Sequence, residues 1–108
     1  MTIDEMAAHL GLEVIHREPD REYTGVYCCD LLSNAMAGAP EDGVWVTVMG
    51  NRNVIAVASL TDVACVVLAA GIQFDPDAVS AAEGTVTLLR SPEPIYETAR
   101  KIGALIET

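Results

Sequence analysis

Short apolar runs rich in β-branched residues alternate along this chain with segments that carry helix-start or helix-end residues. The runs lie at 12–16, 26–29, 43–49, 65–70 and 85–89. Parallel strands need a crossover connection, usually a helix, and the helices then cover the faces of the sheet. The alternation therefore predicts a compact α/β fold, a mostly parallel sheet with helices on both faces.

The first two predicted helices have recognisable start signals. Thr2 and Glu5 have the spacing of a capping box, and Gly11 is placed to end the helix that they begin. Asp30 is predicted to cap a second helix over 31–37.

The segment 54–60 is ambiguous, because a short apolar run cannot be assigned by period alone. As a strand it would form a hairpin with the strand before it. Ala56, Ala58 and Leu60 are good helix formers, and the run that follows makes a better buried strand. These residues favour a helix, for which Asn53 could serve as the N-cap.

Two further helices are predicted near the end of the chain. Asp75 and Pro76 form an N-cap and N1 pair that opens a helix to about Glu83. A final helix is predicted over 92–106. Its apolar stripe consists of Ile95, Ala99, Ile102 and Ile106.

Size and charge narrow the classes of function. The 108 residues are expected to form a single domain, 1–108, with one core that is poor in aromatic residues. The formal net charge of −10 argues against nucleic acid and against anionic membrane surfaces as partners. The longest apolar run, 63–72, is half the length needed to cross a bilayer, and the acidic N-terminus is unlike a signal peptide. We therefore expect a cytoplasmic protein.

The three cysteines do not form a recognisable framework. They are odd in number and lack C-x-x-C spacing, which argues against disulfides and against a zinc or iron–sulfur site. The adjacent Cys28 and Cys29 leave a redox switch open as an alternative. The simpler interpretation is that all three are small apolar residues.

Four residues of one polar loop carry a family resemblance. Asp20, Arg21, Thr24 and Gly25 resemble the signature of the DRTGG domain, although Val26 stands where the second glycine of the name would follow. Asp20 and Arg21 could order this loop through hydrogen bonds and an ion pair, or they could contact a partner.

The resemblance extends over roughly 14–105. A strand that ends at Gly71, an acidic-Pro helix start and a final helix carrying 96–99 (YETA) follow the order seen in the DRTGG domain. That domain is a small α/β module found attached to HPr kinases, to phosphotransacetylases and to pyrophosphatases with cystathionine-synthase-type repeats, and also free-standing. The resemblance implies a regulatory or assembly module.

The sequence lacks the common catalytic signatures. No G-x-x-x-x-G-K-[ST] loop is present, the only lysine is Lys101, and no G-x-G-x-x-G follows a strand. His9 and His16 are the only histidines, and neither has metal-ligand or nucleophile-activating spacing, so both are interpreted as surface histidines. We expect no enzymatic activity, no cofactor and no metal.

Sheet topology nevertheless indicates where a ligand could bind. In open α/β sheets, ligands lie beyond the carboxyl ends of the strands, where loops and helix N-termini converge. The candidate binding residues are Thr24, Gly25, Gly50, Asn51, Arg52, Gly71, Arg90 and Ser91. Arg52 and Arg90 could bind an anion there. The alternative is that the glycines and the asparagine are turn residues.

Three functional hypotheses follow. The favoured one is a non-enzymatic regulatory or assembly module that acts through protein partners and forms a homodimer. The dimer is expected because Val26, Tyr27, Val54, Ile55 and Val57 supply more apolar surface than one thin core needs. A sensor of an anionic, nucleotide-like small molecule is the alternative. A cysteine-based redox switch is the third.

Overall fold

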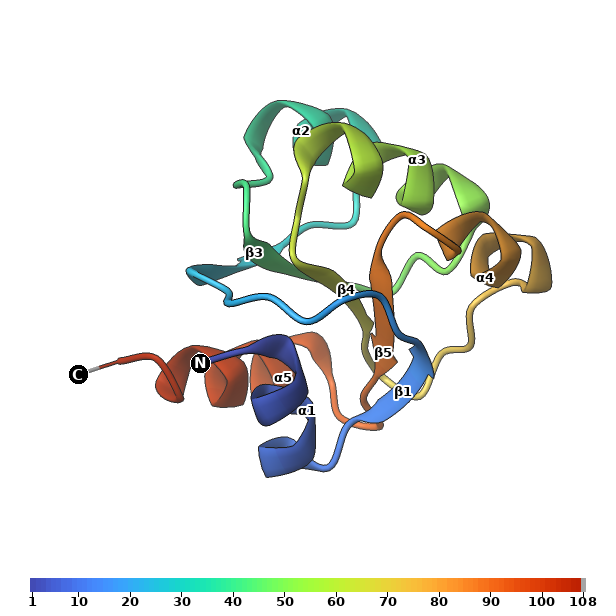
Figure 1. Ribbon diagram of the computed structural model, residues 1–108. Coiled ribbons are helices and arrows are strands. Elements are labelled where there is room, and N and C mark those ends of the chain that lie inside the picture. Colours follow the sequence, from blue (N-terminus) through green and yellow to red (C-terminus); the bar gives the residue numbers. More distant parts are fainter. Residues whose placement is uncertain (108) are drawn as a thin grey trace.

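A computed structural model describes residues 1–107 as three layers, with a sheet between two layers of helices (Figure 1). The elements are α1 (Ile3–Leu10), β1 (Glu13–His16), β2 (Gly25–Cys28), α2 (Leu32–Gly38), β3 (Gly43–Thr47), α3 (Arg52–Thr61), β4 (Cys65–Leu68), α4 (Pro76–Ala82), β5 (Thr87–Arg90) and α5 (Ile95–Ala104). This order confirms the predicted alternation of strands and helices.

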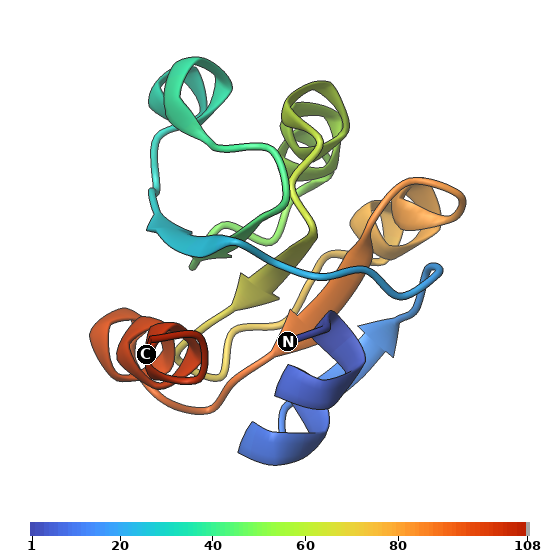
Figure 2. The same ribbon diagram turned by 60° about the vertical axis from the view of Figure 1, so that its left-hand side comes forward.

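The sheet has the strand order β1-β5-β4-β3-β2. Strands β2 to β5 are parallel to their neighbours, whereas β1 pairs with β5 in the antiparallel direction. Because successive parallel strands step one way across the sheet, right-handed crossovers put α2, α3 and α4 on one face. Helices α1 and α5, which come from the two ends of the chain, cover the other face (Figures 1 and 2).

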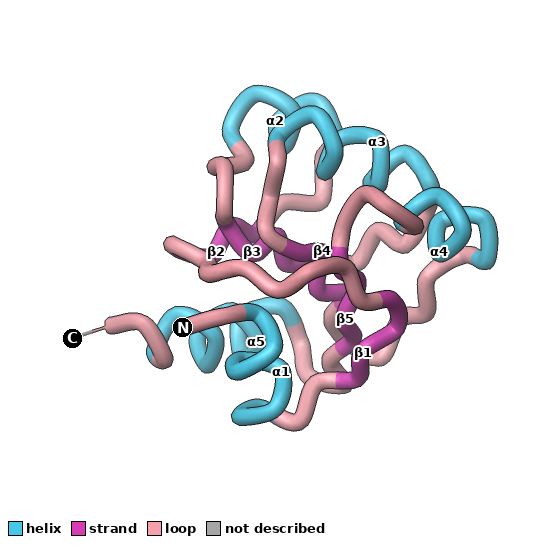
Figure 3. Tube along the Cα trace, in the orientation of Figure 1, coloured by secondary structure: helices cyan, strands magenta, loops and turns pink. Residues whose placement is uncertain are grey.

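Two apolar clusters fill the spaces above and below the sheet. Trp45 and Leu68 are fully buried beneath α2, α3 and α4, and Met6 and Ile102 are fully buried between the sheet and the pair α1 and α5. Only Ile102 of the predicted apolar stripe in the final helix is fully buried. The tube in Figure 3 shows how the helix layers enclose the strands.

The ambiguous segment 54–60 lies in helix α3, as the sequence favoured. Its position also removes one argument for a dimer. Val54, Ile55 and Val57 face the sheet and are at most 4% exposed. The expectation that these three supply surplus surface apolar area is therefore wrong. Val26 and Tyr27, on the edge strand β2, are half-buried.

Three local predictions about helix ends have different outcomes. The capping box is confirmed, because Thr2 Oγ1 accepts from Glu5 N and Glu5 Oε1 accepts from Thr2 N. Asp30 does not cap α2, because its Oδ1 accepts from Thr47 Oγ1 at 2.7 Å instead. Asn51, and not Asn53, is the N-cap of α3.

The structure also shifts several predicted boundaries. The third and fourth strands end earlier than expected, at Thr47 and Leu68, and the last strand begins at Thr87 instead of Thr85. Ala70 has a φ of 58°, a left-handed conformation that ends the extended run. The final helix is limited to α5, because 91–94 form its entry turn.

Candidate functional site

The loops that follow β3, β4 and β5 meet at the carboxyl edge of the parallel strands. Gly71 N donates to Ser91 O at 3.0 Å, and Asp75 N donates to Gly50 O at 2.8 Å. These bonds join the loop after β4 to the end of β5 and to the loop after β3. The structure therefore brings Gly50, Gly71, Arg90 and Ser91 to the same edge of the sheet, as the topology argument predicts.

Arg90 is the positive charge nearest to this junction, and its guanidinium is already bonded. Nε donates to Ile72 O, Nη2 donates to Gly71 O and Nη1 donates to Glu13 Oε2, each at 2.9 Å. Arg90 and Glu13 both line a cavity of about 250 Å³ together with Gly11. Because Glu13 compensates the guanidinium charge, this cavity attracts an anion only weakly.

Ser91 and Gly50 have structural roles at this edge. Ser91 is 3% exposed, its Oγ lies 2.8 Å from Thr98 Oγ1, and it accepts from Glu93 N, so it holds the entry to α5. A Cβ on Gly50 would lie 2.8 Å from Gln73 O, so only glycine fits between the loops after β3 and β4.

Asn51 and Arg52 form the start of α3. Asn51 Oδ1 accepts from Asn53 N at 3.0 Å and from Val54 N at 3.3 Å, which satisfies two amides of the first turn. Arg52 is exposed and lines a different cavity, a groove of about 320 Å³ between α3 and α4. The two candidate anion-binding arginines therefore do not converge on one site.

Thr24 and Gly25 lie at the opposite, amino edge of the parallel strands. Thr24 N donates to Asp42 O at 3.0 Å, and Gly25 pairs with Gly43 at the start of β3. The eight predicted binding residues thus occupy three separate places. They do not form one pocket.

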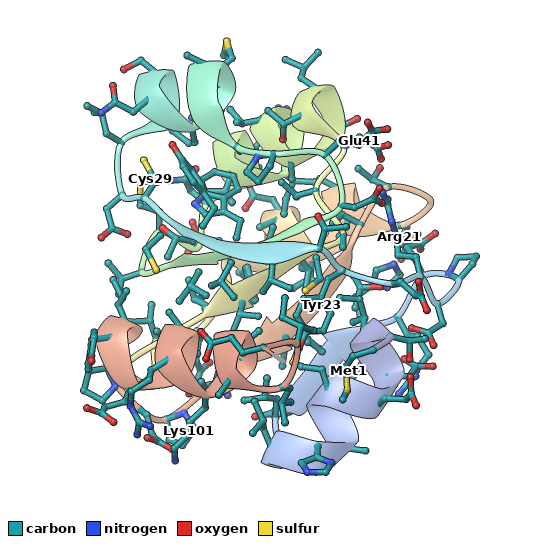
Figure 4. All side chains as sticks on the ribbon, turned by 90° about the vertical axis from the view of Figure 1, so that its left-hand side faces the viewer. Met1, Arg21, Tyr23, Cys29, Glu41 and Lys101 are labelled. Carbon is teal, nitrogen blue, oxygen red and sulfur yellow. The ribbon has the colours of Figure 1, made fainter. Side chains whose placement is uncertain are left out.

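Two residues of the DRTGG-like motif, Asp20 and Arg21, form a cluster of polar contacts at the amino edge of the parallel strands, which we call the clasp. Arg21 Nε donates to Asp42 Oδ1, and Arg21 Nη1 donates to Asp62 Oδ1, both at 3.0 Å. Asp42 precedes β3 and Asp62 follows α3, and both have a left-handed backbone, with φ of 61° and 56°. The hydrogen bonds that Arg21 donates to the carboxylates of Asp62 and Asp42 raise the pKa of Arg21 above its ordinary value. Arg21 therefore ties the N-terminal segment to the loops that precede β3 and follow α3. Figure 4 shows the position of the Arg21 side chain.

Asp20 extends the clasp to the first helix. Its Oδ1 accepts from Asp4 N at 2.9 Å and from Arg21 N at 3.0 Å. Partial burial acts to raise the pKa of Asp20, but these hydrogen bonds outweigh it and lower the pKa overall. Sequence reasoning found both motif residues, but could not tell that their partners would be Asp4, Asp42 and Asp62.

The three cysteines differ in exposure and in their surroundings. Cys28 is exposed, and partial desolvation together with Asp30 raises the pKa of its thiol. Cys29 Sγ donates to Leu31 O at 3.3 Å. Cys65 is buried in β4, and burial raises the pKa of its thiol. A raised pKa lowers the thiolate fraction, so the surroundings of Cys28 and Cys65 do not favour a redox switch at these two residues.

Neither histidine belongs to a group of side chains that could hold a metal ion within residues 1–107. His9 is exposed, whereas His16 is half-buried with its Nε2 2.5 Å from Glu18 Oε2, so it is not the free surface histidine that was expected. Within residues 1–107, no three His, Cys, Asp or Glu side chains are grouped to hold a metal ion. No buried side-chain polar atom in that part of the chain lacks a hydrogen-bond partner. No helix there is long and apolar enough to span a bilayer.

Comparison with known proteins supports the fold. No protein-family model and no curated protein matches this chain. It is similar to a crystal structure of the CBS and DRTGG domains of the regulatory region of Clostridium perfringens pyrophosphatase, complexed with the activator diadenosine tetraphosphate. The TM-score is 0.70 at 12% sequence identity, and the match covers 93% of this chain and 45% of that chain. The chain thus spans less than half of that structure, and its fold is that of a DRTGG-like α/β module.

Proposed function

We propose that this protein is a non-enzymatic regulatory or assembly module of cytoplasmic metabolism, which forms a homodimer and acts through protein partners. One observation carries the proposal. The arginines at both ends of the parallel strands, Arg21 and Arg90, are bonded to carboxylates of the same chain. A second observation supports it, since among residues 1–107 the edge strand β2 pairs with β3 alone. Such an arrangement suits contact with another polypeptide better than chemistry on a small substrate.

Sedimentation velocity at micromolar concentration tests the homodimer. We expect a species of twice the 11.5 kDa chain mass. Its population should rise with ionic strength, because salt screens the repulsion between two chains of formal charge −10. A clean monomer at every salt concentration would contradict the homodimer. A heterologous partner, sought among products of neighbouring genes and titrated as a purified pair, would then be needed to maintain the proposal.

The non-enzymatic part has a separate test. ATP hydrolysis should be absent, because the chain has no phosphate-binding loop and its one lysine, Lys101, is bonded to Glu93 at 2.6 Å. Turnover that co-purifies with the protein and disappears when one of its own carboxylates is replaced would contradict this part.

A small-molecule sensor is the second candidate. It is favoured by the similar pyrophosphatase regulatory region, whose crystal structure contains diadenosine tetraphosphate. Calorimetric titration and thermal unfolding with that compound and with ATP test it. A ligand at 100 times its dissociation constant should add about 2.7 kcal/mol to the free energy of unfolding. Arg52→Gln and Arg90→Gln would then show which cavity binds, and no heat or stabilisation with either compound would count against a nucleotide sensor.

A further inference from the structure

Among residues 1–107, Arg52 differs from the other arginines and from the one lysine in having no ion-pair partner. Those other five side chains, Arg17, Arg21, Arg90, Arg100 and Lys101, each form an ion pair with a carboxylate of the same chain. Arg52 has no such pair within the described residues, although acids outnumber bases by 16 to 6. Its charge and its N–H donors therefore remain available to a group from outside the chain.

Arg52 lines the groove of about 320 Å³ between α3 and α4. These two helices lie side by side on one face of the sheet (Figures 1 and 2). Ile55, which is buried, contributes to the lining, and the short, exposed side chains of Ala56 on α3 and Ala81 on α4 leave the space between the helices open. The volume lies at the lower end of the range for small-molecule pockets, roughly 300–1,000 Å³.

Polar side chains lie at the two ends of this groove. Arg52 begins α3 and Ser59 lies near its end, which places them about 10 Å apart along the helix axis. Thr85, just beyond α4, lines the groove from the other side. The groove therefore offers a positive charge at one end, hydroxyl groups at the other and an apolar middle formed by Ala56 and Ala81.

Two other cavities also contain an arginine, but in both the charge is already compensated. In the cavity of about 250 Å³, Arg90 donates to Glu13 Oε2 at 2.9 Å. A cavity of about 330 Å³ lies at the clasp, where Arg21 is paired with Asp42 and Asp62. Of these three cavities, only the groove between α3 and α4 has an arginine without a carboxylate partner among the described residues.

The backbone at the start of α3 is held in place by contacts on both sides. Asn51 Oδ1 accepts from two amides of the first turn, and Asp75 N donates to Gly50 O at 2.8 Å. These bonds fix the position from which the Arg52 side chain extends. A ligand then has to order that side chain alone, which limits the entropy lost on binding.

We propose that the groove between α3 and α4 binds a small organic anion of one or two charges. Its carboxylate or phosphate pairs with Arg52, its apolar body lies against Ala56 and Ala81, and a neutral hydrogen-bonding group reaches Ser59. The inference rests on the small-molecule alternative of the proposed function, to which it adds a site and a class of ligand. It does not depend on the homodimer.

The size of the groove favours a small molecule over a protein partner. A stable protein interface buries at least about 1,000 Å² in total, far more than a groove that one helix of ten residues can line. An exposed ion pair alone contributes little free energy, so the apolar body must supply part of the affinity.

Charge limits the ligand to one or two negative charges. One guanidinium can pair through two hydrogen bonds with a single carboxylate or phosphate. Further phosphates would meet no other free arginine in the groove, and the formal charge of −10 on the chain repels them. ATP should therefore bind this groove more weakly than a monophosphate of similar body.

Calorimetric titration with two simple anions tests the class of ligand. The probes are para-hydroxyphenylpropionate, which carries a carboxylate, and para-hydroxyphenyl phosphate. Either should bind at least tenfold more tightly than the neutral para-hydroxyphenylpropionamide, and the tighter of the two identifies the preferred head group. Equal binding of the amide and both anions would overturn the role of charge.

Arg52→Gln tests the site, and Arg100→Gln is its matched control. Both arginines are exposed and both changes make the net charge more negative by one, but Arg100 lies on α5, on the other face of the sheet. Arg52→Gln should weaken anion binding at least tenfold, whereas Arg100→Gln should leave it unchanged. Equal affinities for the two variants would overturn the assignment to Arg52.

Filling the groove tests its shape without changing charge. Ala81→Leu should weaken binding of both anions at least tenfold, because the larger side chain occupies the space between α3 and α4. Ala37→Leu, at an exposed alanine of α2, is the control and should bind as the wild type does. Circular dichroism checks that both variants fold, and loss of the fold in Ala81→Leu leaves the arginine variants to decide.

The outcomes separate this site from the proposed function. Binding that is lost in Arg90→Gln but kept in Arg52→Gln would overturn the groove, while the small-molecule sensor would stand on another cavity. No heat and no thermal stabilisation with either anion at millimolar concentration would overturn the inference altogether. The homodimer is unaffected by that result, because sedimentation tests it separately.

Discussion

The two faces of the sheet are built in different ways. On the face covered by α2, α3 and α4, each helix connects two neighbouring strands, so its position follows from the crossover. The face covered by α1 and α5 joins the two ends of the chain. There Tyr23 OH donates to Ile102 O at 2.9 Å, and Ile3 N donates to Arg21 O at 2.9 Å.

The two faces therefore differ in how far they depend on contacts between segments that are distant in the sequence. The first face is held by apolar packing of helices already placed by their connections. The second depends on segments about 80 residues apart meeting correctly, since Tyr23 and Ile102 are separated by 79 positions. A change on the second face should therefore release distant segments, while a change on the first should weaken the whole domain.

The largest expected effect belongs to the first face. Trp45→Ala should reduce the free energy of unfolding by about 3–5 kcal/mol, because Trp45 is fully buried and its replacement leaves a cavity. Urea denaturation followed by circular dichroism measures the loss. Trp45→Phe is the matched control; it keeps most of the volume but loses the bond from Nε1 to Cys29 O, and should lose less. A loss below about 2 kcal/mol for alanine would mean that the site collapses around the missing ring.

Ile102→Ala probes the second face. It should cost about 2–4 kcal/mol, because Ile102 is fully buried against the cluster that contains Met6 and Ala7. Hydrogen exchange should also quicken in α1, more than it does in Trp45→Phe. The half-buried Ile95 supplies the control, with a smaller loss on truncation to alanine. A loss below about 0.5 kcal/mol would show that the stripe is not a core face.

Tyr23→Phe tests the hydrogen bond that joins the chain ends. It should cost about 0.5–1.5 kcal/mol at neutral pH, because the buried carbonyl of Ile102 loses its donor. Burial raises the pKa of Tyr23 to about 12. Since the unfolded tyrosine ionises near pH 10, this residue's stabilisation is complete below pH 10 and is lost as the pH rises from about 10 to 12. The phenylalanine variant should lack that part of the alkaline loss, and an identical pH profile would contradict the assignment.

Replacing Arg21 or Arg90 should give the smallest effects. Arg21→Gln and Arg90→Gln should each cost about 0–1 kcal/mol, because both guanidiniums remain partly exposed and their ion pairs are screened. The loss of free energy of unfolding caused by Arg21→Gln should become smaller in high salt, because salt screens the ion pairs. Arg21→Gln should also increase proteolysis within 17–24, whereas Arg90→Gln should not. Equal cleavage in the two variants would remove the clasp role at the amino edge.

Much of the fold could be predicted from local signals. The capping box at Thr2, the glycine end at Gly11 and Pro76 at the first helical position each act within a few residues, so the sequence alone places these helix ends. Asp75 stands at the predicted N-cap of α4, but its side chain makes no capping hydrogen bond. The apolar runs that become β3 and β4 are fully buried, as parallel central strands require.

The candidate site could be predicted only in part. Topology placed Gly50, Gly71, Arg90 and Ser91 at one edge of the sheet, because the carboxyl ends of parallel strands must meet. It could not tell that Arg90 is neutralised by Glu13, which lies 77 residues away on an antiparallel strand. The direction of β1 is a tertiary result, since a four-residue strand carries no local signal for either direction.

The sequence by itself determined the alternation of elements, the composition of the core and the ends of helices that have their own caps, because these depend on side chains within one turn of each other. Tertiary structure decided where long-range partners lie. Asp30 has the residue type and position of a helix cap, yet Thr47 and the backbone of Val48 take its carboxylate. A capping bond and a cross-strand bond have similar energies, so only the position of β3 in space determines which of the two forms.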